Sequence, residues 1–163
     1  MIAFVALGSN VGDSRAIVMR AMDQLGKLSR VPLKRSSLWE TEPVDCPPNS
    51  APFINAMVAL EPLPAETPET LLKKLKTLEV EFGRKPKTIL NEARPLDLDL
   101  IAFGNEVRNG PELILPHPRA HERRFVLAPW SEIAPDYVMP HQKLSVEKLL
   151  TRLGVGHTAR RLS

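Results

Sequence analysis

The chain alternates between two hydrophobic periods, one typical of strands and one typical of helices. Runs rich in apolar or β-branched residues predict strands over 2–7, 31–40 and 53–60. Apolar residues three or four positions apart predict helices over 17–28, 71–82, 125–130 and 145–153. Strand-like and helix-like segments thus follow one another, without an internal repeat or a low-complexity stretch.

The stretch 94–103 predicts a strand with two chemically different faces. Successive side chains of a strand point to opposite sides, so alternate leucines line one face while Asp97 and Asp99 share the other. Burying unpaired carboxylates is very unfavourable, which favours a wet cleft or a bound cation. Two carboxylates at this spacing can hold Mg²⁺ together with substrate phosphates, which Arg94 also suits. The alternative is an edge strand with its polar face in water, and this stretch alone leaves both readings open.

The order of the elements favours one fold class. A strand and a helix are followed by two strands, a second helix, the strand at 94–103 with a small hairpin, and further helices. Split βαβ units of this kind favour a ferredoxin-like α+β sandwich, a mostly antiparallel sheet with helices packed on it. A length of 163 residues suits one domain, so we expect residues 1–163 to form a single domain.

Composition narrows the classes of partner. The net charge is only +3 and aromatic residues make up 5% of the chain, so the basic surface and stacking platforms of a general nucleic-acid binder are not expected. A small anionic ligand fits better. The single cysteine, Cys46, cannot form an intrachain disulfide or begin a structural zinc site. The apolar N-terminal run is too short for a signal peptide or a membrane span, so we expect a cytoplasmic protein without a membrane partner.

The turn expected after the first strand, Gly8-Ser9-Asn10-Val11-Gly12-Asp13, resembles a phosphate-binding entry. It lacks the lysine of a P-loop, so a P-loop phosphate-binding site is excluded. We interpret Gly8 and Gly12 as residues of a tight turn with close packing, and Asp13 or Ser14 as the N-cap of the next helix.

Three further polar residues are candidates for binding. Asn55 is the only polar residue inside its strand, where it either satisfies local backbone groups or reads the hydrogen-bonding edge of a ligand. Glu79 lies near the C-terminal end of a helix, an unfavourable place for an anion without a partner, although a solvated face is the commoner explanation. His117 is held extended between two prolines, and the arginines at 119, 123 and 124 form either a solvated surface or an anion clamp.

Seven short stretches have an order and spacing that are jointly specific. They are Ala6-Leu7-Gly8-Ser9-Asn10, Ser36-Ser37-Leu38-Trp39-Glu40-Thr41-Glu42-Pro43, Phe53-Ile54-Asn55-Ala56, Glu79 with Gly83-Arg84, Arg94 with Leu96-Asp97-Leu98-Asp99, Leu115-Pro116-His117-Pro118, and Arg123 with Phe125. Together they resemble 6-hydroxymethyl-7,8-dihydropterin pyrophosphokinase, an enzyme family of the folate pathway. The resemblance extends from Ala3 to about Pro140.

This resemblance implies a ferredoxin-like fold with a metal site and a pterin site. Asp97 and Asp99 are the implied ligands of two Mg²⁺ ions that bridge ATP to the pterin. The pterin is expected to stack between Phe53 and Phe125. Its hydrogen-bonding edge is expected to meet Asn55 and the backbone around Thr41, Pro43 and Val44.

The resemblance also implies ATP as co-substrate and transfer of its β,γ-pyrophosphoryl group to the pterin hydroxymethyl oxygen, with release of AMP. Glu79 and His117 fall in the implied ATP site. The implied catalytic or phosphate-binding arginines are Arg84, Arg94 and Arg123. Metal ions and arginines can neutralise the developing charge without a covalent intermediate, and either Asp97 or bulk water can act as the general base. The family is typically small and soluble, and we expect a monomer.

Two departures from the family pattern lie in the loop expected to close over ATP. The family's aromatic-Gly-Pro-Arg run is replaced by Asn91-Glu92-Ala93-Arg94, and a second arginine is replaced by Pro86. Asn91 cannot stack as an aromatic residue would, and Glu92 adds negative charge near phosphates, so we expect weaker lid closure or ATP affinity. The alternatives are a homologue with a degenerate lid, a metal-dependent nuclease or nucleotidyl transferase, and a non-catalytic ligand- or RNA-binding α+β module.

Overall fold

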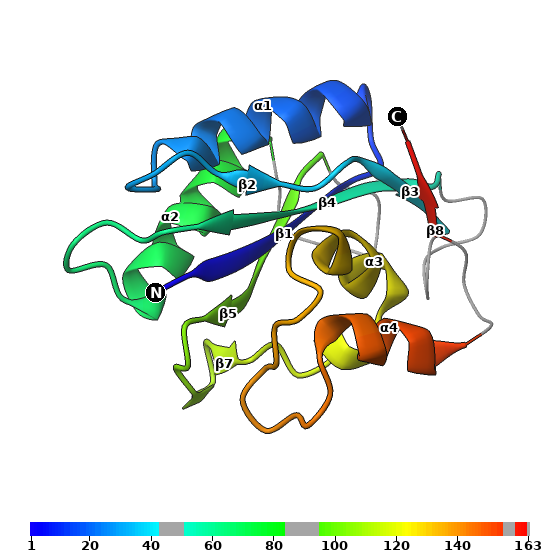
Figure 1. Cartoon of the computed structure of the whole chain (residues 1–163). Coiled ribbons are helices and arrows are strands. Elements are labelled where there is room, and N and C mark those ends of the chain that lie inside the picture. The colour runs from blue at the N-terminus through cyan, green and yellow to red at the C-terminus, as the bar shows by residue number, and fades with distance from the viewer. Residues whose placement is uncertain (43–50, 84–94, 155–158, 163) are drawn as a thin grey trace.

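The chain folds as a βαββαβ unit followed by short helices and a last strand (Figure 1). The structure, a computed structural model, describes residues 1–42, 51–83, 95–154 and 159–162. In chain order the elements are β1 Ala3–Ser9, α1 Ser14–Gly26, β2 Lys34–Arg35, β3 Trp39–Thr41, β4 Phe53–Leu60, α2 Pro68–Glu81, β5 Asp97–Phe103, β6 Arg108–Asn109, β7 Ile114–Leu115, the 3₁₀ turn η1 Ala120–Glu122, α3 Arg124–Ile133, α4 Val146–Leu153 and β8 Ala159–Arg161.

The main sheet has the strand order β5-β1-β4-β3-β8, and β2 pairs with the C-terminal half of β4. The pairings recorded in this sheet are antiparallel. β6 and β7 form a separate two-stranded sheet. The first strand thus lies between the third and the last strand of the βαββαβ unit, which is the ferredoxin-like order, and the predicted α+β class is confirmed.

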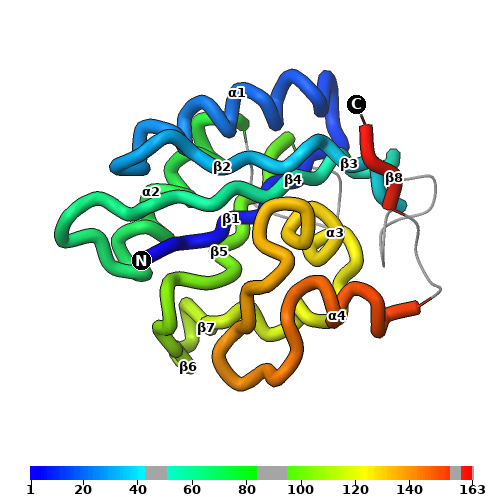
Figure 2. Tube along the Cα trace, viewed as in Figure 1, coloured from blue at the N-terminus to red at the C-terminus, as the bar shows by residue number. Residues whose placement is uncertain are grey.

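Helices cover both faces of the main sheet (Figures 1 and 2). A hydrophobic core lies on each face. On one face, α1 and α2 bury apolar side chains such as Leu25 and Leu75. On the other face, α3 and α4 pack on Met57 of β4 and Ile101 of β5, with Trp130 of α3 fully buried between them. No helix among the described residues is long and apolar enough to cross a membrane.

The predicted strand over 31–40 is in fact two short strands, because Ser36 interrupts the ladder with β4. The Ser36 amide donates to the Met57 carbonyl at 2.9 Å, but the Met57 amide donates to the Ser36 hydroxyl, at 2.8 Å. A side-chain oxygen therefore takes the place of a backbone carbonyl, and the chain shifts between β2 and β3.

The predicted start of the second helix is also wrong, since α2 begins at Pro68 rather than at 71. Proline lacks an amide hydrogen that the first helical turn does not need, so it is tolerated there. Thr67 caps the helix, because its hydroxyl accepts from the Thr70 amide at 3.1 Å and the Thr70 hydroxyl accepts from the Thr67 amide at 2.9 Å.

The first strand is longer than the sequence pattern predicts. Gly8 lies inside β1 rather than in a turn, so the tight-turn interpretation of Gly8 is wrong. Gly12 does occupy the turn, with φ +69. Asp13 is the N-cap of α1 and accepts a hydrogen bond from the Ala16 amide at 3.2 Å, as one of the two predicted caps.

Candidate functional site

The register of the main sheet brings the predicted binding residues into one row. Gly8 of β1 pairs with Asp97 of β5 on one side and with Asn55 of β4 on the other. Two positions along β1, Ala6 pairs with Asp99. Side chains two residues apart share a face, so both carboxylates and the Asn55 amide lie on the side of the sheet that α3 covers. Gly8 and Ala6 of β1, which lie between the carboxylates and the Asn55 amide, have little or no side chain. The surface over β1 is therefore lower than over β4 and β5.

The two predicted faces of β5 are confirmed. Leu98 is buried against α1 and α2 on one face, while Asp97 and Asp99 on the other face are only partly buried. β5 is the edge strand of the main sheet, as one reading of the sequence expected. Its acidic face is nevertheless not a plain solvated surface, because cationic and imidazole groups from the segment before α3 lie close enough to interact with it.

His117 is fixed beside β5 by its own backbone. Its amide donates to the Ile101 carbonyl at 2.9 Å, and its Nδ1 accepts from the Arg119 amide at 3.2 Å. The pKa of His117 is lowered from 6.5 to about 4, mainly by burial and also by the positive charges of Arg123 and Arg119, which Asp97 partly opposes. The imidazole is therefore neutral at pH 7, and its remaining proton belongs on Nε2 because Nδ1 is an acceptor.

Arg123 faces both aspartates. Burial and the charge of Arg119 lower the pKa of Arg123, while Asp99 and Asp97 raise it. An arginine stays charged at neutral pH even so, and it brings a cation to the acidic face. The Arg123 guanidinium also lies over the Phe125 ring, with Cζ 5.4 Å from the ring centroid.

Only part of the predicted arginine cluster points toward the aspartates. Arg119 and Arg123 both act on His117. The Arg124 guanidinium instead donates to the Gly154 carbonyl at the end of α4, so Arg124 joins two helices. The structure thus places one of the three arginines, the half-buried Arg123, at the acidic face, whereas Arg119 is exposed.

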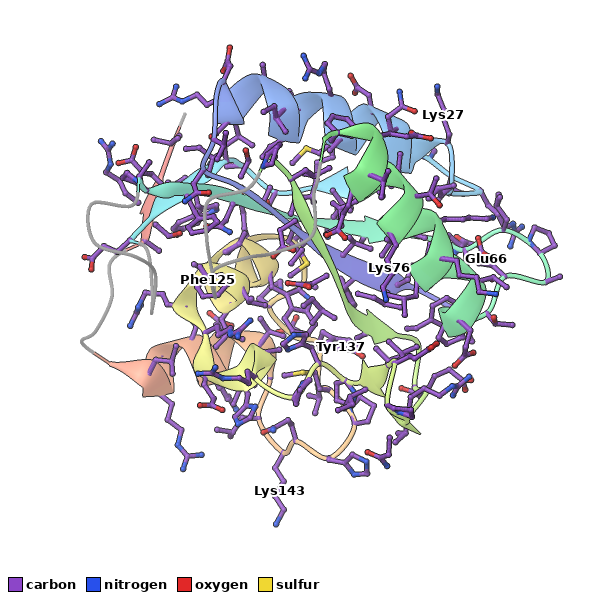
Figure 3. The ribbon with its side chains drawn as sticks, turned by 180° about the vertical axis from the view of Figure 1, so that it is seen from behind. Lys27, Glu66, Lys76, Phe125, Tyr137 and Lys143 are labelled. Atoms are coloured by element: carbon purple, nitrogen blue, oxygen red, sulfur yellow. The ribbon has the colours of Figure 1, made fainter. Side chains whose placement is uncertain are left out.

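The other end of the row is built from buried polar groups. Asn55 and Thr41 are 7% and 4% exposed, and the Thr41 hydroxyl donates to the Asn55 amide oxygen. The Asn55 Nδ2 atom lies 3.5 Å from the Leu7 carbonyl, at the limit of a hydrogen bond. Phe53, which pairs with Thr41, is half-buried on β4. Phe125 is half-buried on the first turn of α3, where Figure 3 labels it.

Glu79 reaches the same strand from the opposite layer. It lies on α2, is 8% exposed, and its carboxylate accepts from the Leu98 amide at 2.8 Å. The interpretation of Glu79 as a solvated residue is therefore wrong, and the partner required near the helix end exists. Leu98 stands between Asp97 and Asp99, so Glu79 holds the backbone on which both carboxylates are mounted.

Four predicted site residues, Pro43, Val44, Arg84 and Arg94, lie outside the described residues.

Asp97 and Asp99 can be compared with the coordination that a metal ion requires. Within the described ranges, no three His, Cys, Asp or Glu side chains gather as a metal site. Mg²⁺ is usually held by one or two carboxylates with waters and substrate phosphates, so Asp97 and Asp99 suit that ion better than a structural metal.

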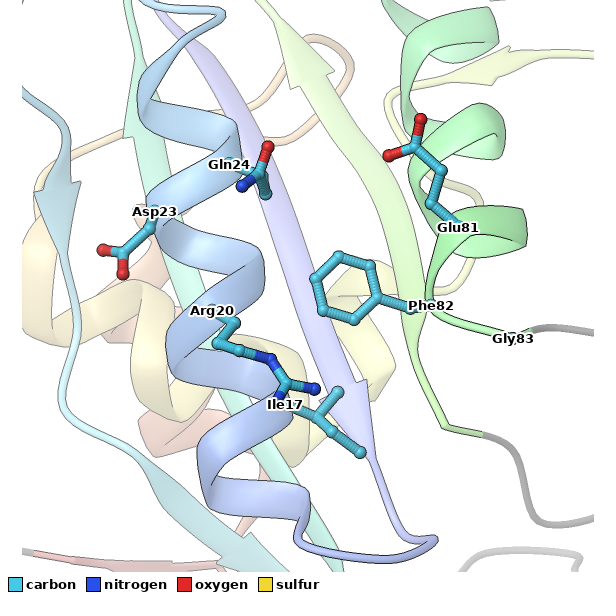
Figure 4. Close-up of a pocket in the computed structure, with 7 residues that line it drawn as sticks. All are labelled: Ile17, Arg20, Asp23, Gln24, Glu81, Phe82 and Gly83. Atoms are coloured by element: carbon cyan, nitrogen blue, oxygen red, sulfur yellow. The ribbon is translucent and has the colours of Figure 1, made fainter.

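One hollow lies away from this row. It is a groove of about 700 Å³ between α1 and the end of α2, lined by Ile17, Arg20, Asp23, Gln24, Glu81, Phe82 and Gly83 (Figure 4). The Arg20 guanidinium covers part of it, with Cζ 5.8 Å from the Phe82 ring centroid. The groove contains no predicted site residue and lies on the α1 and α2 side of the sheet.

Sequence reasoning also passed over Glu132, which lies on the last turn of α3. Its carboxylate accepts hydrogen bonds from Ser37 and Trp39, beside the strand that carries Thr41. The available signal was chemical, because Glu132 is the only acidic residue in the otherwise largely apolar sequence of α3.

The sequence matches a known protein family. The sequence model of 7,8-dihydro-6-hydroxymethylpterin-pyrophosphokinase matches residues 4–135. The 2-amino-4-hydroxy-6-hydroxymethyldihydropteridine pyrophosphokinase of Bacillus subtilis is 39% identical over 81% of this chain and 77% of its own length. The enzyme of the same name from Haemophilus influenzae is 34% identical over 89% of both chains.

Longer proteins contain a similar segment. The folic acid synthesis protein fol1 of Pneumocystis carinii is 34% identical over 92% of this chain, which spans only 20% of that protein. A solved HPPK-DHPS in complex with substrates has the same fold, with a TM-score of 0.72 at 12% identity over 93% of this chain and 45% of the other. The HPPK-DHPS of Plasmodium falciparum gives a TM-score of 0.72 at 13% identity, over 93% of this chain and 41% of the other.

Proposed function

The chain belongs to the 7,8-dihydro-6-hydroxymethylpterin-pyrophosphokinase family of folate synthesis, and we propose that it transfers pyrophosphate from ATP to 6-hydroxymethyl-7,8-dihydropterin in a Mg²⁺-dependent reaction. One observation carries this proposal. Asp97 and Asp99 of β5 lie on the same face of the sheet as the buried Asn55 amide of β4. Gly8 of β1 lies between Asp97 and Asn55. Such a row can hold two substrates side by side, which a transfer between them requires.

The pterin half of the proposed site uses the Asn55 end of the row. A buried amide held by the Thr41 hydroxyl has a fixed direction, so it can recognise the donor and acceptor edge of a pterin ring. Phe53 and Phe125 supply the two aromatic walls between which the flat ring stacks. We assign the rest of the edge to the backbone of Pro43 and Val44.

The nucleotide half of the proposed site uses the Asp97 end. Asp97 and Asp99 would hold two Mg²⁺ ions, which when bound neutralise the phosphate oxygens of ATP. Arg123 adds a fixed cation, and the neutral His117 imidazole donates from Nε2 to a phosphate oxygen. Glu79 lies behind β5, where its hydrogen bond from the Leu98 amide holds the strand that carries both aspartates. We assign Glu79 to the ATP site on the basis of this indirect support.

The proposed step forms one bond and breaks one. The hydroxymethyl oxygen of the pterin attacks the β-phosphorus of ATP, and the bond from that phosphorus to the oxygen bridging to the α-phosphorus breaks. AMP leaves with that oxygen, and the hydroxymethyl proton passes to Asp97 or to water. We assign Arg84 and Arg94 to the charge that develops on the leaving group.

The proposal covers this chain and not the additional parts of its longer relatives. The chain spans 20% of the Pneumocystis carinii protein and 45% of the solved HPPK-DHPS. We further propose that residues 1–163 form one catalytic domain that acts as a cytoplasmic monomer and binds neither nucleic acid nor membranes. The modest net charge of +3 supports the absence of a nucleic-acid partner.

The direct test is to identify the nucleotide product. The purified chain is incubated with ATP and Mg²⁺, with and without 6-hydroxymethyl-7,8-dihydropterin, and the nucleotides are separated by chromatography. We expect AMP that requires the pterin and disappears with EDTA, and no AMP from the Asp97→Ala variant. Formation of ADP, or of AMP without the pterin, would contradict the proposal.

A further inference from the structure

The two proposed walls of the pterin site belong to different layers of the fold. Phe125 is mounted on α3, whereas Thr41 and Phe53 are mounted on β3 and β4. α3 packs on the sheet mainly through apolar side chains such as Val126 and Trp130. Apolar contacts are non-directional, so they do not by themselves fix how far α3 slides along β3.

A polar contact supplies that direction at the other end of α3. The Glu132 carboxylate accepts from the Ser37 amide at 2.9 Å, from the Ser37 hydroxyl at 2.6 Å and from the Trp39 indole at 3.0 Å. Glu132 Oε2 also lies 4.0 Å from the Arg161 guanidinium of β8, which in turn donates to the Ser37 hydroxyl at 3.1 Å. One carboxylate thus joins α3 to β3 and to β8.

The environment of Glu132 keeps this carboxylate ionised. Partial burial disfavours the charge, but hydrogen bonds from the Ser37 and Trp39 side chains and the Ser37 amide outweigh it and lower the pKa of Glu132. Its side chain is 23% exposed, so it is not an ordinary surface glutamate. A solvated surface residue would not hold three donors from one strand and the segment before it.

The position of Glu132 links this contact to the proposed site. Glu132 follows Phe125 by about two turns on the same helix, so a displacement of α3 along the sheet moves both residues. Trp39, which Glu132 holds, pairs with Asn55 in the sheet, and Thr41 follows two residues later on the same strand. A shift at the Glu132 end of α3 therefore changes the separation of Phe125 from Thr41 and Asn55.

We propose that Glu132 is a positioning residue that fixes the gap between the Phe125 wall and the β3–β4 wall of the pterin site. This inference rests on the proposed function. It predicts a larger effect on the pterin than on ATP. Asp97, Asp99 and His117 of the nucleotide half lie on β5 and on the segment before η1, and among the described residues of that half only Arg123, the N-cap of α3, is joined to this helix. Misplacing a binding wall by about 1 Å can lower activity up to roughly a hundredfold, so the effect should be measurable.

The test compares Glu132→Ala with Glu132→Gln. Glutamine keeps the oxygen that accepts from both the Ser37 amide and the Trp39 indole, and its NH₂ can donate to the Ser37 hydroxyl, which still has a free lone pair. We expect Glu132→Ala to raise the KM for the pterin at least about tenfold, with kcat and the KM for ATP changed less than about threefold. We expect Glu132→Gln to stay within about threefold of the natural chain in all three constants.

The matched control is Glu40→Ala, on the same strand. Glu40 pairs with Arg160 of β8 at 3.0 Å but is not bonded to α3, so its loss removes an ion pair of β3 without releasing the helix. We expect an unchanged KM for the pterin in Glu40→Ala. The fluorescence of Trp39, recorded with Trp130→Phe in the background, should change in Glu132→Ala and be retained in Glu132→Gln, because the indole hydrogen bond is lost only in the former.

Three results overturn this inference while leaving the proposed function intact. They are an unchanged KM for the pterin in Glu132→Ala, an equal loss for both substrates together with a lowered melting temperature, and a Glu132→Gln variant as impaired as Glu132→Ala. Absence of pterin-dependent AMP from the natural chain overturns the proposed function instead, and the positioning role of Glu132 with it.

Discussion

Replacing Gly8 by alanine should separate the folding of this protein from its binding of the pterin. Gly8 occupies the middle of the row between Asp97 and Asn55, and its φ is not in the left-handed region. An alanine can adopt this strand conformation without backbone strain, and it removes the entropic disadvantage of glycine in a strand, about 0.5–1 kcal/mol. The backbone thus accepts the substitution, and the new methyl group becomes the only perturbation.

The structure gives the size of that perturbation. The added Cβ would lie 3.0 Å from Asn55 Nδ2 and 3.8 Å from the Phe53 ring. Ordinary contacts of this kind are near 3.5 Å, so the Asn55 amide must move by about 0.5 Å. It cannot move freely, since Asn55 is buried and its oxygen accepts from the Thr41 hydroxyl. A displacement of about 1 Å can lower activity roughly a hundredfold, so half of it corresponds to about tenfold.

We therefore expect Gly8→Ala to keep its free energy of unfolding within about 1 kcal/mol of the natural chain, because the backbone gain offsets the crowding. The KM for the pterin should rise about tenfold, and the KM for ATP should change little. The measurements are urea unfolding and steady-state AMP formation with each substrate varied in turn.

Gly26→Ala is the matched control. Gly26 is the last residue of α1, and a methyl group there meets nothing within 4 Å. We expect Gly26→Ala to raise stability by up to about 1 kcal/mol and to leave both KM values unchanged. An unchanged KM for the pterin in Gly8→Ala would refute the claim that Asn55 reads the pterin. A loss of stability of several kcal/mol would instead show that Gly8 serves packing alone.

Four other perturbations probe the rest of the site. Asp97→Ala should lower turnover at least about a hundredfold while changing stability by less than about 1 kcal/mol, and parallel losses in both assays would point to a structural carboxylate. Phe125→Ala should raise the KM for the pterin about tenfold, as loss of one stacking wall implies, and a larger effect on ATP would reverse that assignment. His117 should titrate near pH 4 by NMR in the ligand-free protein. Its pKa is lowered on folding, so its contribution to stability is complete above pH 6.5 and is lost as the pH falls through 4, on the order of 1–2 kcal/mol after allowance for solvent screening; this loss should be absent from His117→Gln. Glu79→Ala should destabilise the fold by about 1–3 kcal/mol because it leaves the Leu98 amide unpaired, whereas Glu79→Gln should retain most of the stability; equal behaviour of the two variants would exclude the hydrogen bond as the cause.

Local patterns in the sequence were sufficient for the parts of the fold that depend on neighbouring residues. The two faces of the strand that carries Asp97 follow from alternation alone, because side chains in a strand alternate by geometry. Capping chemistry placed the start of α1 at Asp13 or Ser14, and Asp13 is the cap in the structure. The order of strands and helices was also sufficient for the ferredoxin-like class.

The features that the sequence did not predict depend on contacts between distant segments. Gly8 gains its place in the row only through its register with β4 and β5, which no local pattern specifies. The same holds for Glu132, whose hydrogen-bond donors Ser37 and Trp39 lie more than ninety positions away in the chain. β8 is short and polar, and it is a strand only because β3 offers it an open edge.

Hydrophobic periodicity also did not predict where a single side chain changes the backbone hydrogen bonding. Ser36 breaks a run that reads as one strand, because its hydroxyl replaces a backbone carbonyl in the ladder. The acceptor role of Glu79 likewise could not be foreseen from α2 alone. It needs the unpaired amide that the edge strand β5 presents at Leu98.

The most direct test of the central claim is to follow the phosphorus atoms of ATP by ³¹P NMR during one reaction with 6-hydroxymethyl-7,8-dihydropterin and Mg²⁺. The account predicts that the β and γ resonances disappear together and return as one coupled pair in the pterin diphosphate, while the α resonance becomes that of AMP. Resonances of ADP with a pterin monophosphate would mean that only the γ-phosphoryl group moves, and they would contradict the account.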